Sequence, residues 1–273
     1  MVEEALARYL PVASSQVPPA FNQAAHYALF PGGKRLRPVL TLLGAEIVGG
    51  TLDEALPVAV AVEFVHTSSL IFDDLPCMDN AAERRGRVAL HAKYGEGLAV
   101  LVALSFLNTA YGLAFTGLNG DAARGVAAHR ELVECIGERG MVAGQSVDLA
   151  QNNAPETVRN LKTSALMRLA LRVGALRSGA NETQLAALSR FAELLGEAYQ
   201  ISDDVLDLSE DAAFARDETL AQAAGAKIAQ ARVQALISDA KATLLNAFGP
   251  TRPAHLLCEM ADYVAARTGE GEK

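Results

Sequence analysis

Residues 66–80 read His-Thr-Ser-Ser-Leu-Ile-Phe-Asp-Asp-Leu-Pro-Cys-Met-Asp-Asn. The apolar residues that lead into this segment contain no helix breaker after Pro57, which suits a first helical turn, so we predict a mostly buried helix from about Asp53 to Asp74. Pro76 has no N–H and cannot continue that helix. We therefore expect a loop between Asp74 and Asp79, which lets the carboxylates on either side of Pro76 converge.

The same segment places three carboxylates just before three guanidinium groups, those of Arg84, Arg85 and Arg87. Crowded carboxylates raise one another's pKa or require a counter-charge. A hard divalent cation supplies that charge, and Mg²⁺ is commonly held by one or two carboxylates together with substrate phosphates. The alternative for this segment alone is a solvated helix end with surface ion pairs, and a second acidic cluster decides between the two.

Such a second cluster ends another apolar helical pattern, where residues 200–207 read Gln-Ile-Ser-Asp-Asp-Val-Leu-Asp. Asp203 and Asp207 lie one turn apart on one helix face, an arrangement that is unfavourable without a cation. Two aspartate faces across a helical bundle can bind several Mg²⁺ ions with a diphosphate between them. The apolar helix faces beside them would then form a pocket for a hydrocarbon chain.

The composition indicates an all-α protein. The 273 residues are 51% hydrophobic, include no Trp, and show little of the period-two alternation that marks β-strands. The expected helices span residues 3–10, 18–29, 39–48, 53–74, 90–116, 121–148, 155–174 and 181–207, the last with a capping box made by Asn181 and Gln184. A net charge of −8 disfavours nucleic acid or an anionic membrane surface as the main partner.

Cysteine usage and hydropathy suggest a cytoplasmic protein. Three cysteines lie far apart without a CxxC pair, which favours neither a disulfide framework nor a zinc site. The acidic N-terminus lacks the features of a signal peptide. Residues 97–120 contain no charge and are long enough to span a bilayer, but polar side chains dilute them and their flanks are not basic. We expect a central helix buried on all sides, and no stable membrane insertion.

Further polar groups surround these clusters in sequence. Residues 31–38 read Pro-Gly-Gly-Lys-Arg-Leu-Arg-Pro, a glycine-rich basic turn before a helix that suits a phosphate, with a solvated turn as the alternative. His66 lies two turns before Asp73 and can face the same cavity. Gln145 and Asp148 share a helix face, and Lys162 precedes a threonine on an otherwise apolar helix.

Six motifs in series, from Gly32 to Asp207, resemble the trans-isoprenyl diphosphate synthases, the polyprenyl synthetase family, and most closely its bacterial geranylgeranyl and farnesyl types. They are GGKRLRP, HxxSLIFDDLPCMD, RRGR, GQSVD, LKT and YQISDDVLD. The resemblance implies a single large helical bundle of the isoprenoid synthase type around a central cavity, with residues 1–273 as one polyprenyl synthetase domain. It also implies a homodimer that works with Mg²⁺ on isopentenyl diphosphate and an allylic prenyl diphosphate.

The resemblance assigns roles residue by residue. Isopentenyl diphosphate would be bound by Lys34, Arg37, His66 and Arg85. The allylic diphosphate would be bound by Arg84, Lys162, Thr163 and Gln200. The magnesium ions would be held by Asp73, Asp74, Asp79, Asp203, Asp204 and Asp207. The residues closest to the chemistry would be Asp73, Asp74, Asp79, Asp203 and Lys162.

Product length in this family is limited by side chains one or two turns before the first aspartate motif. Ser68 and Ser69 are small, which favours geranylgeranyl diphosphate over farnesyl diphosphate, although Phe106 or Tyr111 from a neighbouring helix can also close the pocket. Residues 99–107 lack the acidic residue that many farnesyl synthases carry there, which points the same way. A farnesyl diphosphate synthase is the alternative.

Two departures from the family pattern keep other functions open. Residues 208–224 contain no lysine, and alanines stand at positions 81, 82 and 89 where acidic residues and a threonine are common. These changes leave a non-catalytic or regulatory homologue as a more remote alternative. A class I terpene cyclase shares the first motif, but the DDxxD spacing at 203–207 and the basic turn favour chain elongation. A purely structural helical protein leaves the two acidic clusters unexplained.

Overall fold

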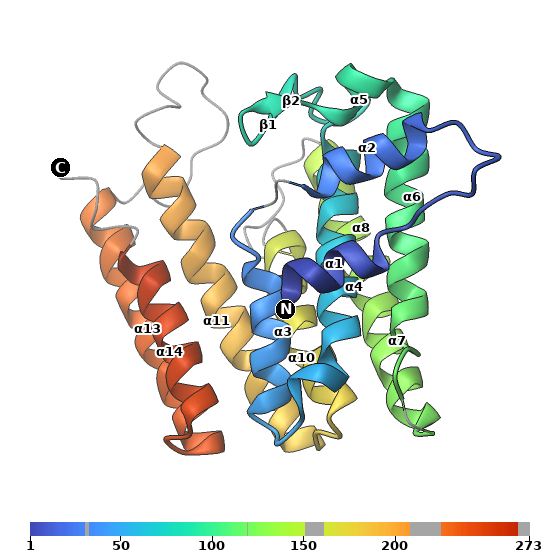
Figure 1. The fold of residues 1–273 in the computed structure, drawn as a ribbon. Helices are drawn as coiled ribbons and strands as arrows, with labels where there is room; N and C mark the ends of the chain where they lie inside the picture. Colours follow the sequence, from blue (N-terminus) through green and yellow to red (C-terminus); the bar gives the residue numbers. More distant parts are fainter. Residues whose placement is uncertain (31–32, 119, 151–160, 208–224, 267–273) are drawn as a thin grey trace.

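The computed structural model describes residues 1–30, 33–118, 120–150, 161–207 and 225–266, and of residues 161–163, 204–207 and 226 the backbone alone. The chain folds into an all-α bundle, as predicted (Figure 1). Its helices are α1 (Val2–Tyr9), α2 (Ala20–Leu29), α3 (Leu36–Glu46), α4 (Leu52–Asp73), α5 (Leu90–Tyr94), α6 (Glu96–Leu113), α7 (Ala122–Ile136), α8 (Met141–Leu149), α10 (Leu161–Arg177), α11 (Glu182–Asp207), α13 (Ala226–Phe248) and α14 (Arg252–Ala266).

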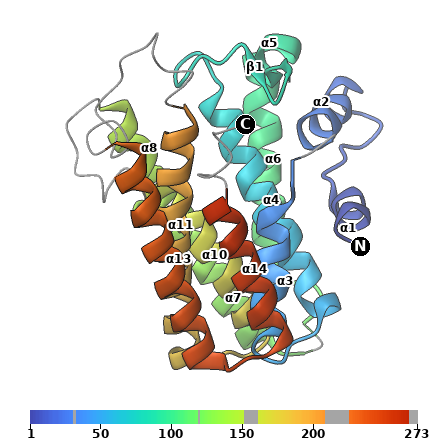
Figure 2. The same cartoon turned by 90° about the vertical axis from the view of Figure 1, so that its left-hand side faces the viewer.

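Helix α10 occupies the middle of the bundle and packs against α3, α4, α7, α8 and α11. On one side, α11 packs against α13 and α14; on the other, α4 packs against α6 (Figure 1). Helices α1 and α2 lie across one face, beside α4 and α6 (Figure 2). The side chains of Leu166, Met167, Leu169, Leu171 and Val173 place α10 in the apolar core.

Helices α3 and α10 cross with their backbones in contact. A Cβ atom on Gly44 would lie 2.3 Å from the carbonyl oxygen of Leu171, and one on Gly174 would lie 2.0 Å from the carbonyl oxygen of Thr41. Real Cβ atoms do not approach a carbonyl so closely, so only glycine fits at either position. This pair of glycines sets the distance between the two helices.

Helix α4 begins earlier than the pattern around Pro57 predicts. The side chain of Thr51 caps it by accepting a hydrogen bond from the N–H of Glu54 at 3.4 Å. Pro57 consequently lies in the second turn, where its missing N–H leaves the carbonyl of Asp53 without an intrahelical partner. The helix ends at Asp73, with Asp74 as its C-cap, one residue before the predicted end.

Two predicted helices are divided by glycine. The segment 90–116 breaks at Gly95, whose φ of 86° is left-handed, into α5 and α6. The segment 121–148 breaks between α7 and α8, where the N–H of Gly140 donates to the carbonyl of Gly137 at 3.0 Å. The capping box before α11 is confirmed, because Asn181 and Gln184 each accept the other's backbone N–H.

A short antiparallel hairpin, β1 (Glu83–Arg84) and β2 (Arg87–Val88), was not predicted. Its two turn residues, Arg85 and Gly86, both have positive φ values, of 54° and 70°. This is the geometry of a type I′ turn, which matches the twist of a two-residue hairpin. In the described part of the chain it is the one sheet, and it carries the arginine motif.

Two helices, α4 and α6, are long and apolar enough to cross a membrane by length and composition alone. The apolar window of α4 is 72% buried, which marks it as a core helix. The window of α6 is only 33% buried. The expectation that this segment is buried on all sides is therefore wrong for the single chain, because none of the described helices packs over one face of α6.

Candidate active site

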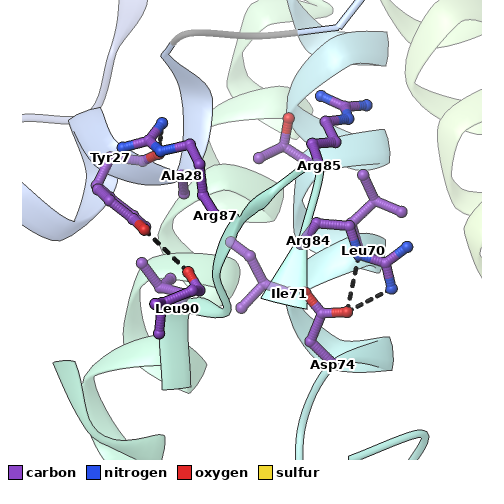
Figure 3. A pocket seen from close by; sticks show the side chains of 11 residues that line it. Tyr27, Ala28, Leu70, Ile71, Asp74, Arg84, Arg85, Arg87 and Leu90 are labelled. Atoms are coloured by element: carbon purple, nitrogen blue, oxygen red, sulfur yellow. Dashed lines mark hydrogen bonds and ion pairs between the residues drawn. The ribbon is translucent and has the colours of Figure 1, made fainter. Parts of the chain in front are cut away.

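Consecutive aspartates at the end of α4 line two different hollows. Asp74 lines a small hollow of about 60 Å³ together with Tyr27, Thr67, Arg84, Arg85 and Arg87, which we name the cationic pocket (Figure 3). Asp73 lines a larger hollow of about 250 Å³ between α4, α6, α7 and α8, which we name the apolar cavity. The end of α4 thus separates a charged region from an apolar one.

In the cationic pocket, Arg84 is bound to the buried carboxylate of Asp74. Its Nε donates to Asp74 Oδ1 at 2.9 Å, and its Nη2 contacts the same oxygen. This hydrogen bond, and the charges of Asp74, Asp73 and Asp79, raise the pKa of Arg84. Arg84 therefore lies within the electrostatic reach of all three carboxylates of the first motif, whereas Arg85 points away from Asp74 (Figure 3).

The loop after α4 folds back on the helix end, as the sequence predicts. The N–H of Asp79 donates to the carbonyl of Asp73 at 2.9 Å, and the carbonyl of Leu75 accepts from Met78 and Asn80. Asn80 closes the loop with a φ of 52°. Asp73 and Asp79 are thereby brought together, with Asp73 buried and Asp79 exposed.

Contacts with α2 hold the hairpin in place. The guanidinium of Arg87 lies 3.8 Å from the ring centroid of Tyr27 and donates to the carbonyl of Phe30 at 2.8 Å. The hydroxyl of Tyr27 donates to the carbonyl of Val88 at 2.9 Å (Figure 3). Nothing in the sequence links Tyr27 to the arginine motif some 60 residues later, so this support was not predicted.

His66 joins the hairpin to the basic turn before α3. Its Nε2 lies 3.3 Å from Arg37 Nη1 and 3.4 Å from Arg85 Nη2. Because a guanidinium only donates, Nε2 accepts, and Nδ1 carries the ring proton. Burial and the neighbouring arginines, Arg37 first and then Arg85 and Arg84, lower the pKa of His66 well below its usual value, so the ring is neutral at pH 7.

This cluster presents buried donors without an acceptor in the described part of the chain. His66 Nδ1 and Arg37 Nε are both buried and have no hydrogen-bond partner there. Burial also lowers the pKa of Arg37. Unpaired buried donors among several positive charges are costly, and an anion such as a diphosphate would satisfy them. Lys34, on the same basic turn, is exposed and donates to the hydroxyl of Tyr263 on α14.

The apolar cavity has four helical walls. Its lining consists of Val65, Ser68, Ser69, Phe72 and Asp73 of α4, Met78, Leu107 of α6, Ile136 of α7, and Met141, Val142, Gln145, Ser146 and Leu149 of α8. Ser69 Oγ donates to the carbonyl of His66 at 2.8 Å, whereas the buried Ser68 Oγ has no partner among the described residues. Both serines of the expected small-residue wall line this cavity, little more than one turn before Asp73.

The far wall differs from the expectation. Phe106 is fully buried and packs on Phe64, with ring centroids 5.0 Å apart, and Tyr111 packs on His129 at 5.5 Å. Neither of these aromatic residues belongs to the lining; Leu107 and Ile136 stand there instead. Helix rotation accounts for this, since one residue along an α-helix turns the side chain by about 100°.

The second acidic cluster ends α11. Asp203 is partly exposed, and its charge offsets a small part of the lowering of the Arg37 pKa by burial, which places it near the basic cluster. Gln200 Oε1 is buried and has no partner among the described residues. The side chains of Lys162, Thr163, Asp204 and Asp207 lie outside the described residues, as do positions 208–224 with their missing lysine.

The acidic residues match a magnesium ion in donor type. Within the described residues, no group of three His, Cys, Asp or Glu side chains is gathered as a ready metal cage. Mg²⁺ does not require one, because it usually binds one or two carboxylates and completes its shell with waters and substrate phosphates. The carboxylates of Asp73, Asp79 and Asp203 are hard oxygen donors of the kind that this ion binds, so the residues fit it in donor type.

The comparisons with known proteins agree with this geometry. The family model described as Polyprenyl synthetase matches residues 18–254. "Geranylgeranyl pyrophosphate synthase 7, chloroplastic" of Arabidopsis thaliana is 36% identical over 273 aligned residues, which cover 93% of this chain and 78% of the relative. "Heterodimeric geranylgeranyl pyrophosphate synthase large subunit 2" of the same plant is 39% identical, over 76% of this chain and 56% of the relative.

A solved structure is similar to this chain in both fold and sequence. The crystal structure of a FPP/GFPP synthase from Zymomonas mobilis, without ligand, aligns with a TM-score of 0.86 over 97% of this chain and 95% of its own, at 31% identity. The helical-bundle architecture expected from the motifs is therefore confirmed.

Proposed function

Since the chain belongs to the polyprenyl synthetase family, we propose that it is a magnesium-dependent trans-prenyltransferase, which condenses isopentenyl diphosphate with an allylic diphosphate to give geranylgeranyl diphosphate. One observation carries this proposal. Asp73 of α4 lines an apolar cavity, and the same helix carries His66, which with Arg37 presents buried donors that have no partner among the described residues. A substrate with a hydrocarbon tail and a diphosphate head matches both halves.

The basic cluster binds the diphosphate of isopentenyl diphosphate. Arg37 Nε and His66 Nδ1 are buried donors without a partner in the part of the chain that the structure describes. Arg85 adds charge from the hairpin, and Lys34 adds charge from the basic turn. The neutral His66 ring keeps two guanidiniums within 3.4 Å of one nitrogen, which concentrates positive charge where the anion arrives.

The acidic end of α4 and the end of α11 hold the allylic diphosphate. In this proposal the allylic diphosphate is bound by Arg84, Lys162, Thr163 and Gln200. The magnesium ions are bound by Asp73, Asp74, Asp79, Asp203, Asp204 and Asp207. When bound, Mg²⁺ supplies Lewis-acid stabilisation of the leaving diphosphate. Asp73 and Asp79 lie on either side of the loop that ends α4, and in this proposal they bind the metal with Asp74 beside them.

In the reaction, the allylic C–O bond breaks and its electron pair leaves with the diphosphate. The isopentenyl double bond attacks the allylic carbon, forming the new C–C bond, and a proton is lost to the departing diphosphate. The chain's contribution at this stage is exclusion of water: Val65, Phe72 and Leu107 wall the cavity in which the cationic carbon forms.

The cavity favours a long product. Ser68 and Ser69 leave the α4 wall open, so the growing chain passes between α4 and α6 towards Leu107 and Ile136. The named relatives differ in product, since the Arabidopsis proteins are geranylgeranyl synthases and the Zymomonas protein is a FPP/GFPP synthase. Farnesyl diphosphate is accordingly the second candidate product. Leu107 closes the far wall of the cavity, and a shorter cavity would favour this shorter chain.

We also propose that residues 1–273 form one domain that assembles as a homodimer through α6. Val100, Leu101 and Leu104 are 38%, 56% and 56% exposed on one face of this helix, which lies at the edge of the bundle (Figure 1). A contiguous apolar face of this kind marks an interaction surface.

We also propose a cytoplasmic location. It suits the three cysteines, which are free thiols in the structure.

A product analysis tests the function. The purified protein is incubated with Mg²⁺, labelled isopentenyl diphosphate and, separately, dimethylallyl, geranyl or farnesyl diphosphate, and the chain lengths are resolved. We expect a twenty-carbon product from each primer. A fifteen-carbon end product keeps the mechanism and contradicts the product length. Absence of condensation with every primer, despite magnesium-dependent diphosphate binding, favours a regulatory homologue instead.

A further inference from the structure

We propose that Arg35 is a positioning residue for the isopentenyl diphosphate site, and that helix α1 contributes to that site through Glu3. The inference rests on the proposed function, because it concerns how the basic turn before α3 is held for its substrate. Arg35 lies between Lys34 and Arg37 in sequence, yet its side chain is almost fully buried, at 9% exposed.

The guanidinium of Arg35 is bound from three elements. Its Nη1 donates to Glu63 of α4 at 2.6 Å, its Nε donates to Glu3 of α1 at 2.7 Å, and its Nη2 donates to the carbonyl of Leu29 at the end of α2, at 2.9 Å. Because the side chain is buried and held from three sides in this way, Arg35 is not available to a substrate anion.

The backbone directs neighbouring side chains to different places. Arg35 adopts the left-handed conformation, with φ 52° and ψ 32°, at the N-cap of α3. This conformation costs a non-glycine residue free energy and persists only where its surroundings hold it. Lys34 reaches Tyr263 of α14, and Arg37 reaches His66. The ion pairs of Arg35 therefore fix both the turn that carries Lys34 and the first turn of α3, which carries Arg37.

The two glutamates have unequal roles. Glu63 is 2% exposed, so loss of Arg35 would leave a buried carboxylate without its partner and would threaten the fold itself. The side chain of Glu3 is 58% exposed, so its charge can be removed without burying an unpaired group. Glu3 is consequently the residue through which positioning can be separated from stability.

The test compares Glu3→Gln with Glu4→Gln. Both variants remove one negative charge from α1, but Glu4, 85% exposed, pairs with the N-terminal amine at 3.2 Å instead of Arg35. We expect Glu3→Gln to raise KM for isopentenyl diphosphate about threefold to tenfold, with KM for the allylic substrate and kcat unchanged. Glu4→Gln should match the unmutated protein. Hydrogen exchange of residues 33–40 should quicken in Glu3→Gln alone.

Several outcomes decide the proposal. Equal effects of the two variants overturn it, as does an equal rise in both KM values. Faster exchange or a lower melting temperature without a change in KM for isopentenyl diphosphate makes Arg35 an anchor of the fold only, and also overturns it.

If the unmutated protein does not catalyse condensation of isopentenyl diphosphate with any allylic diphosphate, the proposed function is wrong, independently of the role of Arg35. Calorimetric binding of inorganic pyrophosphate then decides the positioning role. Weaker binding in Glu3→Gln than in Glu4→Gln supports it, and equal binding overturns it.

Discussion

Helices α4 and α6 lie side by side and have similar apolar compositions, yet they are used in opposite ways (Figure 1). Helix α4 is mostly buried, and three polar residues near its C-terminal end, Ser68, Ser69 and Asp73, line the apolar cavity. Helix α6 offers the site only Leu107 and turns an apolar face outward. Hydropathy thus identifies a long apolar helix, while the neighbours of that helix decide what each face does.

The contrast separates three properties that substitutions can address one at a time. Changes at the end of α4 should alter the chemistry. Changes on the outer face of α6 should alter assembly, and changes on the facing walls of the two helices should alter product length.

The largest effect is expected at the end of α4. Asp73→Asn keeps the shape of the side chain and removes its charge, and we expect initial condensation rates to fall about 10³-fold, because metal-assisted stabilisation of the leaving group is worth several kcal/mol. Asp53→Asn, in the exposed first turn of the same helix, is the matched control and should retain activity. Equal rates for the two variants would remove Asp73 from the chemistry.

The outer face of α6 should respond in assembly. The double substitution of Leu101 and Leu104 by Glu places two charges in the proposed interface, and we expect the dimer to weaken about 10²-fold or more. Light scattering after size exclusion measures the mass at several concentrations. Val12→Glu changes another exposed apolar residue, 68% exposed and far from α6 in sequence, and should leave the dimer intact. A wild-type protein that is monomeric throughout contradicts the interface.

On the α4 wall, Ser69→Phe should shorten the product. The added ring fills the cavity below Asp73, and we expect the ratio of twenty-carbon to fifteen-carbon product to fall about tenfold, as overpacking costs about 1–3 kcal/mol. Ser69→Ala keeps the wall small and should preserve the ratio. An unchanged product from Ser69→Phe would mean that the chain grows elsewhere.

On the α6 wall, the expected change is smaller and in the opposite direction. Leu107→Ala deepens the cavity, so the share of products longer than the wild-type product should rise by about twofold to tenfold. Leu104→Ala is the same substitution one turn earlier, on the outer face, and should not change the product. Product chromatography distinguishes the two, and identical profiles would refute the assignment of Leu107 to the wall.

The smallest effect concerns His66 and pH. Its folded-state pKa lies below the unfolded value near 6.5, so below that pH the unfolded chain binds more protons and the free energy of unfolding decreases as pH falls. Above pH 6.5 the contribution is constant. We expect His66→Gln to lose less stability between pH 7 and 5 than the unmutated protein, by up to about 1.4 kcal/mol per pH unit. Urea titrations measure this, with the exposed His255→Gln as control.

Local sequence signals predicted the helices well where the signal itself is local. The loop forced by Pro76 and the capping box at Asn181 depend on residues a few positions apart, and both are present. The breaks at Gly95 and between α7 and α8 were missed, because a glycine inside an apolar pattern is compatible with either a kink or an end.

Contacts between segments that are distant in the sequence could not be predicted from the sequence. The motifs named the cationic and acidic residues, but not that Asp73 and Asp74 line different hollows. Tyr27 supports a hairpin that lies roughly 60 positions later in the sequence, and Glu3 supports a basic turn that lies roughly 30 positions later. The side chains in these contacts follow no periodic pattern. Tertiary packing decides such pairs, and a single sequence carries no local trace of them.

The glycine crossing of α3 and α10 has a consequence for redesign. Backbone atoms set the spacing there, so replacing core side chains does not change it. Helix α3 begins beside the basic turn and α10 begins at Leu161, so this crossing fixes the spacing of two helices that lead to the proposed diphosphate-binding residues. The walls at Ser69 and Leu107 are the adjustable part of the enzyme. A library that varies residues 69 and 107 and keeps Gly44 and Gly174 can therefore search for new product lengths while the spacing of α3 and α10 stays the same.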